Sequence, residues 1–193
     1  MGRGGGRRRK RREAVGRGEG GRGRTRRNGR LGAALAGEGW IVTSGLARGI
    51  DTAVHCGALS VPAGRTVAVS ALPLDRVYPR ENFELARRII RRGALVTEHA
   101  LRDDCGKVSF LRRNRIISGL SLALFIVETA ATGGTRRQAE NALAQGRPLY
   151  VMEPPASEAR ALAGFREMIR IGAKPCHDIE TAVAIARQAG SIG

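Results

Sequence analysis

Two kinds of segment alternate along the chain after residue 30. Short apolar runs such as "IVTS" at 41–44 and "LALFIVET" at 122–129 are typical of strands buried on both faces. Longer segments with apolar residues at helical spacing lie between them, for example "RENFELARRIIRRG" at 80–93. In that segment four bulky residues are expected to face the core: Phe83, Leu85, Ile89 and Ile90.

The whole pattern predicts five strands and six helices. The predicted strands lie at 41–44, 65–72, 94–98, 122–129 and 148–152, and the predicted helices at 30–40, 52–59, 80–93, 135–146, 158–173 and 179–190. Strands and helices that alternate with short links favour an α/β fold of the Rossmann-like class, with a mostly parallel sheet and helices on both faces. In such a sheet, ligands bind beyond the carboxyl ends of the strands. We therefore expect one Rossmann-like domain over residues 31–193, with its site in the loops that follow strands.

The basic charge is concentrated at the amino-terminal end. Residues 1–30 hold 13 of the 34 Lys and Arg residues but only 2 of the 17 acidic residues. This Gly/Arg-rich, low-complexity segment has too little apolar surface to offset its ordering entropy, which predicts a disordered tail. It could bind nucleic acid without regard to sequence, through salt-sensitive contacts with phosphates. A solubilising role, or a start-site artefact, explains the composition equally well.

The cysteine pattern argues against a metal site or a disulfide framework. Cys56, Cys105 and Cys176 are odd in number and widely spaced, and they form no C-x-x-C motif. We therefore expect reduced thiols, a cytoplasmic setting, and neither a metal nor another cofactor. No run of about 18 apolar residues is present, so the sequence predicts no membrane span.

The first candidate site is the segment "TSGLARGID" at 43–51, which links the strand at 41–44 to a helix. Gly45 and Gly49 allow the backbone to approach an anion closely and to adopt positive φ. The helix that follows offers unpaired N–H groups and a positive dipole end. Arg48 adds a forked donor that matches phosphate oxygens, and Ser44 precedes the turn. Such a turn suits phosphate binding, although many α/β folds use one only for tight packing.

The second candidate site is "KVSFLRRNRIISGLS" at 107–121. Its cations are Lys107, Arg112, Arg113 and Arg115, and Phe110 lies among them. Cations around an exposed ring are a typical arrangement for binding a single strand, because phosphates pair with the cations and a base stacks on the ring. The alternative is that Phe110 belongs to the core and the arginines form a solvated face.

Taken together, these motifs resemble the DNA-processing protein A family, called DprA or Smf. The resemblance is carried by "SGLARGIDTAVHCGAL", "LDRVYPREN", "GALVTE" and "RRNRIISGLS" and covers roughly residues 38–154, with a looser likeness up to "DIETAV". It implies a cytosolic, homodimeric Rossmann-fold protein that is not an enzyme. Such a protein binds single-stranded DNA during natural transformation and passes it to a RecA-type recombinase.

The resemblance also implies roles for individual residues. Arg48 would contact a phosphate, Lys107 the DNA backbone and Phe110 a base. The motif Arg113, Asn114 and Arg115 would line the same pocket, with some members serving its architecture. Asp51 is expected to cap the helix that follows the glycines, and His55 to pack in the core.

The chain departs from the family pattern in several loops. The usual first strand, with its Gly-Ser-Arg-like turn, is represented only by "AVGRG" inside the basic segment, and "SALPLD" and "HALRDDCGK" replace the usual sequences. Two other hypotheses therefore stay open. Gly133-Gly134-Thr135 with Glu140 resembles the nucleotide-binding turn of the lysine-decarboxylase-like (LOG) phosphoribohydrolases, in which a carboxylate assists glycosidic cleavage. The other hypothesis is that the chain is a degenerate, truncated relative that binds nucleic acid only through its tail.

Overall fold

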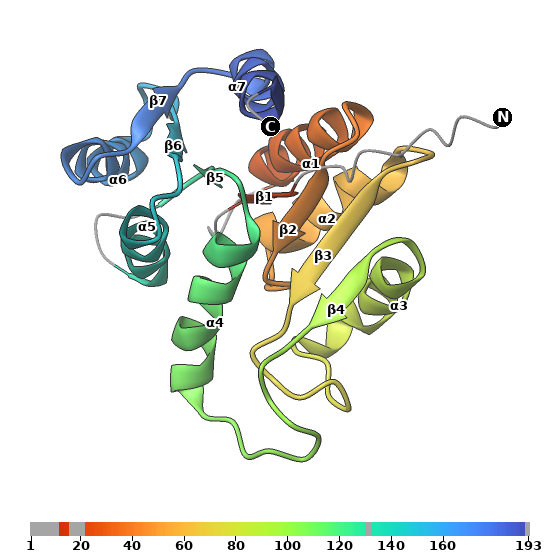
Figure 1. The fold of residues 1–193 in the computed structure, drawn as a ribbon. Coiled ribbons are helices and arrows are strands. Elements are labelled where there is room, and N and C mark those ends of the chain that lie inside the picture. Colours follow the sequence, from red (N-terminus) through yellow and green to blue (C-terminus); the bar gives the residue numbers. More distant parts are fainter. Residues whose placement is uncertain (1–11, 16–21, 130–132, 192–193) are drawn as a thin grey trace, which may run out of the picture.

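The computed structural model describes residues 12–15, 22–129 and 133–191, which form one α/β unit around a parallel sheet (Figure 1). The strands are β1 (Arg12–Val15), β2 (Ile41–Ser44), β3 (Arg65–Val69), β4 (Ala94–Val96), β5 (Leu124–Ile126), β6 (Leu149–Met152) and β7 (Lys174–Cys176). The helices are α1 (Arg22–Gly37), α2 (Ile50–Ser60), η1 (Arg80–Asn82), α3 (Phe83–Arg92), α4 (Lys107–Leu120), α5 (Gly134–Ala144), α6 (Ala159–Arg170) and α7 (Ile179–Ser191). The predicted fold class is confirmed.

The sheet has the strand order β4-β3-β2-β1-β5-β6-β7, and every pairing between neighbours is parallel. The chain runs outward from β1 to β4 and then returns to place β5 on the other side of β1. This reversal makes the β1–β5 gap the topological switch point of the sheet. It also puts the loops after all seven strands, and the amino ends of the helices that follow, at one edge of the sheet.

Alternate residues of β5 pack into separate cores on the two faces of the sheet. Phe125 belongs to a cluster with α1, α2 and α7, whereas Leu124 and Ile126 belong to a cluster with α4, α5 and α6. This follows from the period of two along a strand. The expected helix layers on both faces are therefore present.

The prediction of a disordered tail through residue 30 is wrong in two places. Arg12–Val15 forms β1 in the middle of the sheet, in register with both β2 and β5, and α1 begins at Arg22. A central position supplies ladder hydrogen bonds on both sides of a strand, which compensates for a short segment with few apolar residues. The rest of the predicted tail lies outside the described residues.

The core prediction for α3 is half right. Leu85 and Ile89 are buried, but Phe83 is 52% exposed and Ile90 is 57% exposed. The helix packs over the β3–β4 end of the sheet and buries only a narrow stripe, which Ala86 completes. The sequence analysis also missed β7, whose short "KPC" segment has no strand pattern of its own. Across the described part of the chain, no helix is both long and apolar enough to cross a bilayer.

His55 packs in the core, as expected. Its ring is fully buried, and Nδ1 lies 2.7 Å from the hydroxyl of Thr66. That hydroxyl donates to the carbonyl of Val42 at 2.6 Å, so it must accept from a protonated Nδ1. Burial lowers the pKa of His55 to about 3, which keeps the imidazole neutral.

The stability of the fold is expected to depend on pH through His55. Its pKa is lower in the folded protein than in the unfolded chain, so the unfolded state binds more protons between the two values. The free energy of unfolding should therefore be highest above about pH 6.5 and fall by up to about 1.4 kcal/mol per pH unit below it. Urea unfolding at pH 7.5 and pH 5.0, followed by the fluorescence of Trp40, measures this change.

His55→Asn is the matched control, because its amide can still donate to Thr66 but does not titrate. The variant should lose most of the difference between pH 7.5 and pH 5.0. An unchanged difference would show that another group causes it.

Candidate functional site

The sequence-predicted site residues lie at the carboxyl edge of the sheet. They come from two segments: residues 44–49 at the end of β2 (the glycine turn) and the first turns of α4. The loop 70–82 after β3 lies next to the glycine turn (Figure 1). Because β2 and β3 are neighbours in the sheet, the glycine turn and the loop 70–82 leave it side by side. Helix α4 lies on the face of the sheet opposite to α1 and α2, and it contacts β1, β2 and β3.

The glycine turn has a strained but well-supported backbone. Leu46 has a φ of 61° and Gly49 a φ of 82°, so the turn enters the left-handed region at both positions. The side chain of Asn82 stabilises it by donating to the carbonyl of Leu46 at 2.8 Å and to the hydroxyl of Thr52 at 2.9 Å. The turn is therefore held by the loop that leads into α3.

Asp51 does not cap α2 as expected. The N-cap residue is Gly49, with no side-chain hydrogen bond, and Asp51 lies in the first turn of the helix. Its carboxylate instead accepts the backbone N–H of Ala47 at 3.1 Å. The carboxylate thus stabilises the glycine turn, on the amino side of the helix, where a negative charge also complements the helix dipole.

Arg48 points out of the turn and is paired with an acid. Its guanidinium forms a two-point ion pair with Glu81 of η1, one arm of which, Nη2 to Oε2, measures 3.0 Å. The hydrogen bond from Arg48 holds the pKa of Glu81 below its usual range, so the pair persists at neutral pH. Both side chains are more than half exposed, so the pair is open to competition from another anion.

Tyr78 connects the two candidate motifs. The guanidinium carbon of Arg48 lies 5.8 Å from the centre of the Tyr78 ring, within cation–π range. On its other side, Tyr78 makes an edge-to-face contact with Phe110 of α4, with ring centres 5.4 Å apart. Lys107 lies one helical turn before Phe110, is exposed, and makes no ion pair with a described residue. Arg48, Tyr78, Phe110 and Lys107 thus form a continuous surface, called the Arg–Tyr–Phe–Lys surface below.

Arg113 is buried instead of facing a ligand. It is 1% exposed, and its Nη1 donates to the carbonyl of Gly45 and to that of Val69, the latter at 2.7 Å. A Cβ at Gly45 would overlap this guanidinium, which explains why the position holds glycine. The arginine thus joins α4 to the carboxyl ends of β2 and β3.

The two residues after Arg113 also have intramolecular partners. Asn114 is buried and donates to the carbonyl of Gly134 at 3.3 Å, which connects α4 to the start of α5. Arg115 is exposed and forms an ion pair with Glu98 in the loop after β4. Ser44 is fully buried at the end of β2. In this structure the exposed cations of the two predicted motifs are therefore Arg48, Lys107, Arg112 and Arg115.

Sequence analysis missed Tyr78 and Glu81 as site residues. Both belong to "LDRVYPREN", a segment that carries the family resemblance. An aromatic residue in a polar, proline-containing loop after a strand was the available signal. Its two contacts, however, come from β2–α2 and α4, which local patterns do not bring together.

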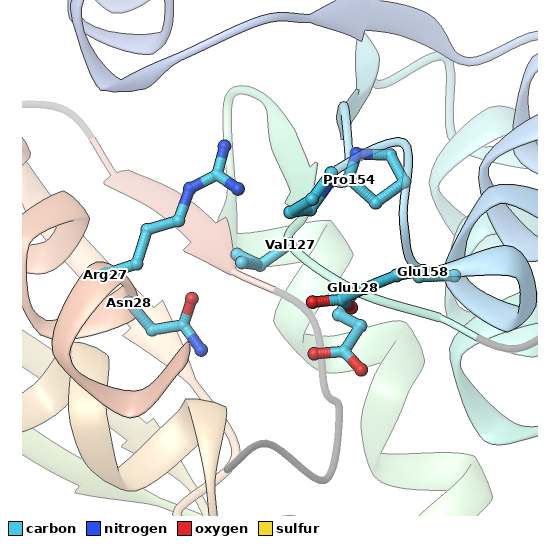
Figure 2. Close-up of a pocket in the computed structure, with 8 residues that line it drawn as sticks. Arg27, Asn28, Val127, Glu128, Pro154 and Glu158 are labelled. Atoms are coloured by element: carbon cyan, nitrogen blue, oxygen red, sulfur yellow. The ribbon is translucent and has the colours of Figure 1, made fainter. Parts of the chain in front are cut away.

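A separate cavity of about 300 Å³ lies at the switch point, outside the Arg–Tyr–Phe–Lys surface. Figure 2 shows Arg27 and Asn28 reaching toward it from α1, with Val127, Glu128, Pro154 and Glu158 on the opposite side. Glu140, the carboxylate of the phosphoribohydrolase hypothesis, does not line this cavity. It pairs with Arg136 on the same helix at 3.0 Å.

The described residues contain no group of three or more His, Cys, Asp and Glu side chains that could hold a metal ion. The three cysteines are free thiols. Burial raises the pKa of Cys176 to about 11, which keeps that thiol protonated.

The chain is similar to known DNA-processing proteins. Residues 17–187 match the family described as DNA recombination-mediator protein A. The chain is 36% identical to DNA processing protein DprA of Bacillus subtilis over 137 residues, which cover 71% of this chain and 46% of that protein. It is 43% identical to Protein Smf of Escherichia coli over 122 residues, 63% of this chain and 32% of that protein. It therefore spans less than half the length of these relatives.

Solved structures show the same fold. DNA processing protein A from Streptococcus pneumoniae superposes with a TM-score of 0.79 at 28% identity, over 91% of this chain and 61% of that one. The protein of the same name from Helicobacter pylori, studied for its single-stranded DNA binding mode, gives 0.82 at 23% identity, over 92% and 80%. The molybdenum cofactor carrier protein of Chlamydomonas reinhardtii gives 0.64 at 21% identity, over 95% and 99%, a likeness of fold alone.

Arg113→Ala should destabilise the fold. It removes two charge-assisted hydrogen bonds to backbone carbonyls and leaves a gap between α4 and the strand ends, which should lower the free energy of unfolding by about 3 kcal/mol. Arg115→Ala, two residues on, removes an exposed ion pair and should change it by less than about 1 kcal/mol. Urea titration followed by Trp40 fluorescence measures both values. Equal values for the two variants would contradict the structural role of Arg113.

Proposed function

Because the chain belongs to the DNA recombination-mediator protein A family, we propose that it binds single-stranded DNA on the Arg–Tyr–Phe–Lys surface. The observation that carries the proposal is the position of Tyr78, which contacts Arg48 on one side and Phe110 on the other. It turns two motifs that are about 60 residues apart in the sequence into one surface. The Helicobacter pylori relative, which was studied for its single-stranded DNA binding mode, supports the same ligand.

Each member of the surface has a distinct role in this proposal. Arg48 and Lys107 pair with phosphates, since both cations are exposed at the sheet edge. Phe110 and Tyr78 offer ring faces or edges to the bases, as in other proteins that bind single strands without sequence preference. Arg113 and Asn114 are buried and hold α4, and with it Phe110 and Lys107, in position. Gly45 and Gly49 allow the turn to adopt its shape. Ser44 lies at the start of that turn, and Arg115 extends the cationic surface along α4.

The wider role follows from the family resemblance. The protein would protect incoming DNA during natural transformation and pass it to a RecA-type recombinase, as a cytoplasmic homodimer. It would act by binding, without catalysing a reaction on the DNA. The phosphoribohydrolase hypothesis has less support, since Glu140 is paired with Arg136 and lies outside the cavity at the switch point.

Arg48→Ala and Lys107→Ala should each weaken binding of oligo-dT by the full chain. Each removes one charge-assisted contact with a phosphate, worth at least about 1 kcal/mol, or about five-fold in affinity. Each should also reduce the slope of log K against log salt by about 0.7, the value for one phosphate on a single strand. Fluorescence anisotropy at several salt concentrations measures both effects.

The matched controls carry the same charges elsewhere. Arg65 is exposed at the opposite edge of the sheet, where β3 begins, and Lys174 is exposed on the edge strand β7. Arg65→Ala and Lys174→Ala should leave affinity nearly unchanged. If all four variants lose affinity equally, binding depends on overall charge and the assignment of this surface is wrong.

Glu81→Gln should strengthen binding. Glu81 holds the Arg48 guanidinium in a two-point ion pair, so a phosphate must displace a carboxylate that is ionised at neutral pH. Removing that charge frees the Arg48 guanidinium to pair with the phosphate. The expected result is a tighter oligo-dT complex, with no gain when Glu81→Gln is combined with Arg48→Ala. A gain that persists in the double variant would mean that Glu81 acts by general charge alone.

A further inference from the structure

The loop after β3 and the start of α3 enclose a second cavity, of about 500 Å³, beside the Arg–Tyr–Phe–Lys surface. Its lining residues are Leu72, Asp75, Arg76, Val77, Tyr78, Arg80 and Phe83. We propose that this cavity holds a nucleobase of the bound single strand, next to the nucleotide that contacts Arg48 and Phe110. The inference rests on the proposed function and assigns a further contact to it.

The shape and size of the cavity suit a base. Its volume lies within the range of roughly 300–1,000 Å³ that is usual for small-molecule sites. Leu72 and Val77 supply partly buried apolar walls, and two aromatic rings border the cavity. A base is flat, apolar on both faces and able to stack on any ring, so it complements such a lining.

The exposure of the rings is the second observation. Tyr78 is 50% exposed and Phe83 is 52% exposed, although the pattern of α3 predicts that Phe83 faces the core. Phe83 is the first residue of α3, and the helix buries Leu85 and Ile89 without it. The ring of Phe83 therefore remains available beside the cavity.

The position of Tyr78 makes the cavity continuous with the proposed DNA surface. Tyr78 lines the cavity and also contacts Arg48 and Phe110. Tyr78 therefore borders both Phe110 and the cavity that Phe83 lines. The two sites thus suit successive nucleotides of one strand.

The charges around the cavity suit the phosphate that links those nucleotides. Arg80 is exposed and makes no side-chain hydrogen bond or ion pair with a described residue. It directly precedes Glu81, the partner of Arg48. Arg76 is already used within the protein, since it donates to the carbonyl of Asp103 and lies 3.8 Å from Asp75. Arg80 is therefore the cation that the cavity offers to DNA.

The test is a titration of the full chain with oligo-dT carrying one 2-aminopurine, a base whose emission is quenched on stacking. Phe83→Ala should weaken binding about five-fold or more, the loss usual for one stacked base, and should reduce the quenching. Phe83→Tyr, which keeps the ring, should bind like the wild type. Ile90→Ala is the matched control, because Ile90 is 57% exposed on the same helix and does not line the cavity.

The outcomes separate this inference from the function on which it rests. If Phe83→Ala binds like the wild type while Arg48→Ala is weakened, the cavity holds no base and the DNA surface stands. If the wild type does not bind oligo-dT, both proposals fail. If Phe83→Ala and Ile90→Ala lose affinity equally, the effect comes from helix α3 as a whole and the assignment to the cavity is wrong. Thermal unfolding of each variant, followed by Trp40 fluorescence, shows whether a loss of affinity comes from unfolding.

Discussion

The arrangement of the site depends on the buried guanidinium of Arg113. It joins helix α4 to the carbonyls of Gly45 and Val69, which lie just after β2 and at the end of β3. Phe110 and Lys107 precede it at helical spacing, so this attachment also positions them at the sheet edge. A buried cation is costly unless its donors are used. Nη1 of Arg113 makes both of these hydrogen bonds, whereas its Nε and Nη2 are buried without a partner in the described part of the chain. The same contact requires a glycine at position 45, because a side chain there would overlap the arginine.

The Arg–Tyr–Phe–Lys surface has cations that attract phosphates, but one of them is already paired with an acid. Arg48 is the cation best placed for an anion, yet it is paired with Glu81 and packed over Tyr78. Pairing keeps the guanidinium in one orientation but lowers the gain from binding a phosphate, since one ion pair replaces another. Lys107 has no such acid among the described residues. The two cations are thus expected to differ in how strongly they favour DNA, although both lie at the same edge of the sheet.

The switch point of the sheet and the Arg–Tyr–Phe–Lys surface are different places. Open α/β sheets commonly bind ligands at the switch point, and here that position has a cavity with Glu128 and Glu158 in its lining. These two carboxylates outnumber Arg27, the cation of that lining, which makes the cavity a poor environment for a phosphate. The exposed cations and rings gather instead over β2, β3 and the start of α4. The fold therefore offers two locations, and the charges favour the second for a nucleic acid.

The α/β alternation could be predicted from the sequence, because strands buried on both faces and helices buried on one face have different hydrophobic periods. The two motifs of the site could be predicted from their glycines, cations and aromatic residue. The sequence did not reveal β1, since four residues among Gly and Arg become a strand only through their neighbours β2 and β5. Nor could it separate Arg113 from Arg115, one buried and one exposed on the same helix. Those outcomes, like the exposure of Phe83 and the contacts of Tyr78, depend on which distant backbone groups and side chains the tertiary structure brings within reach.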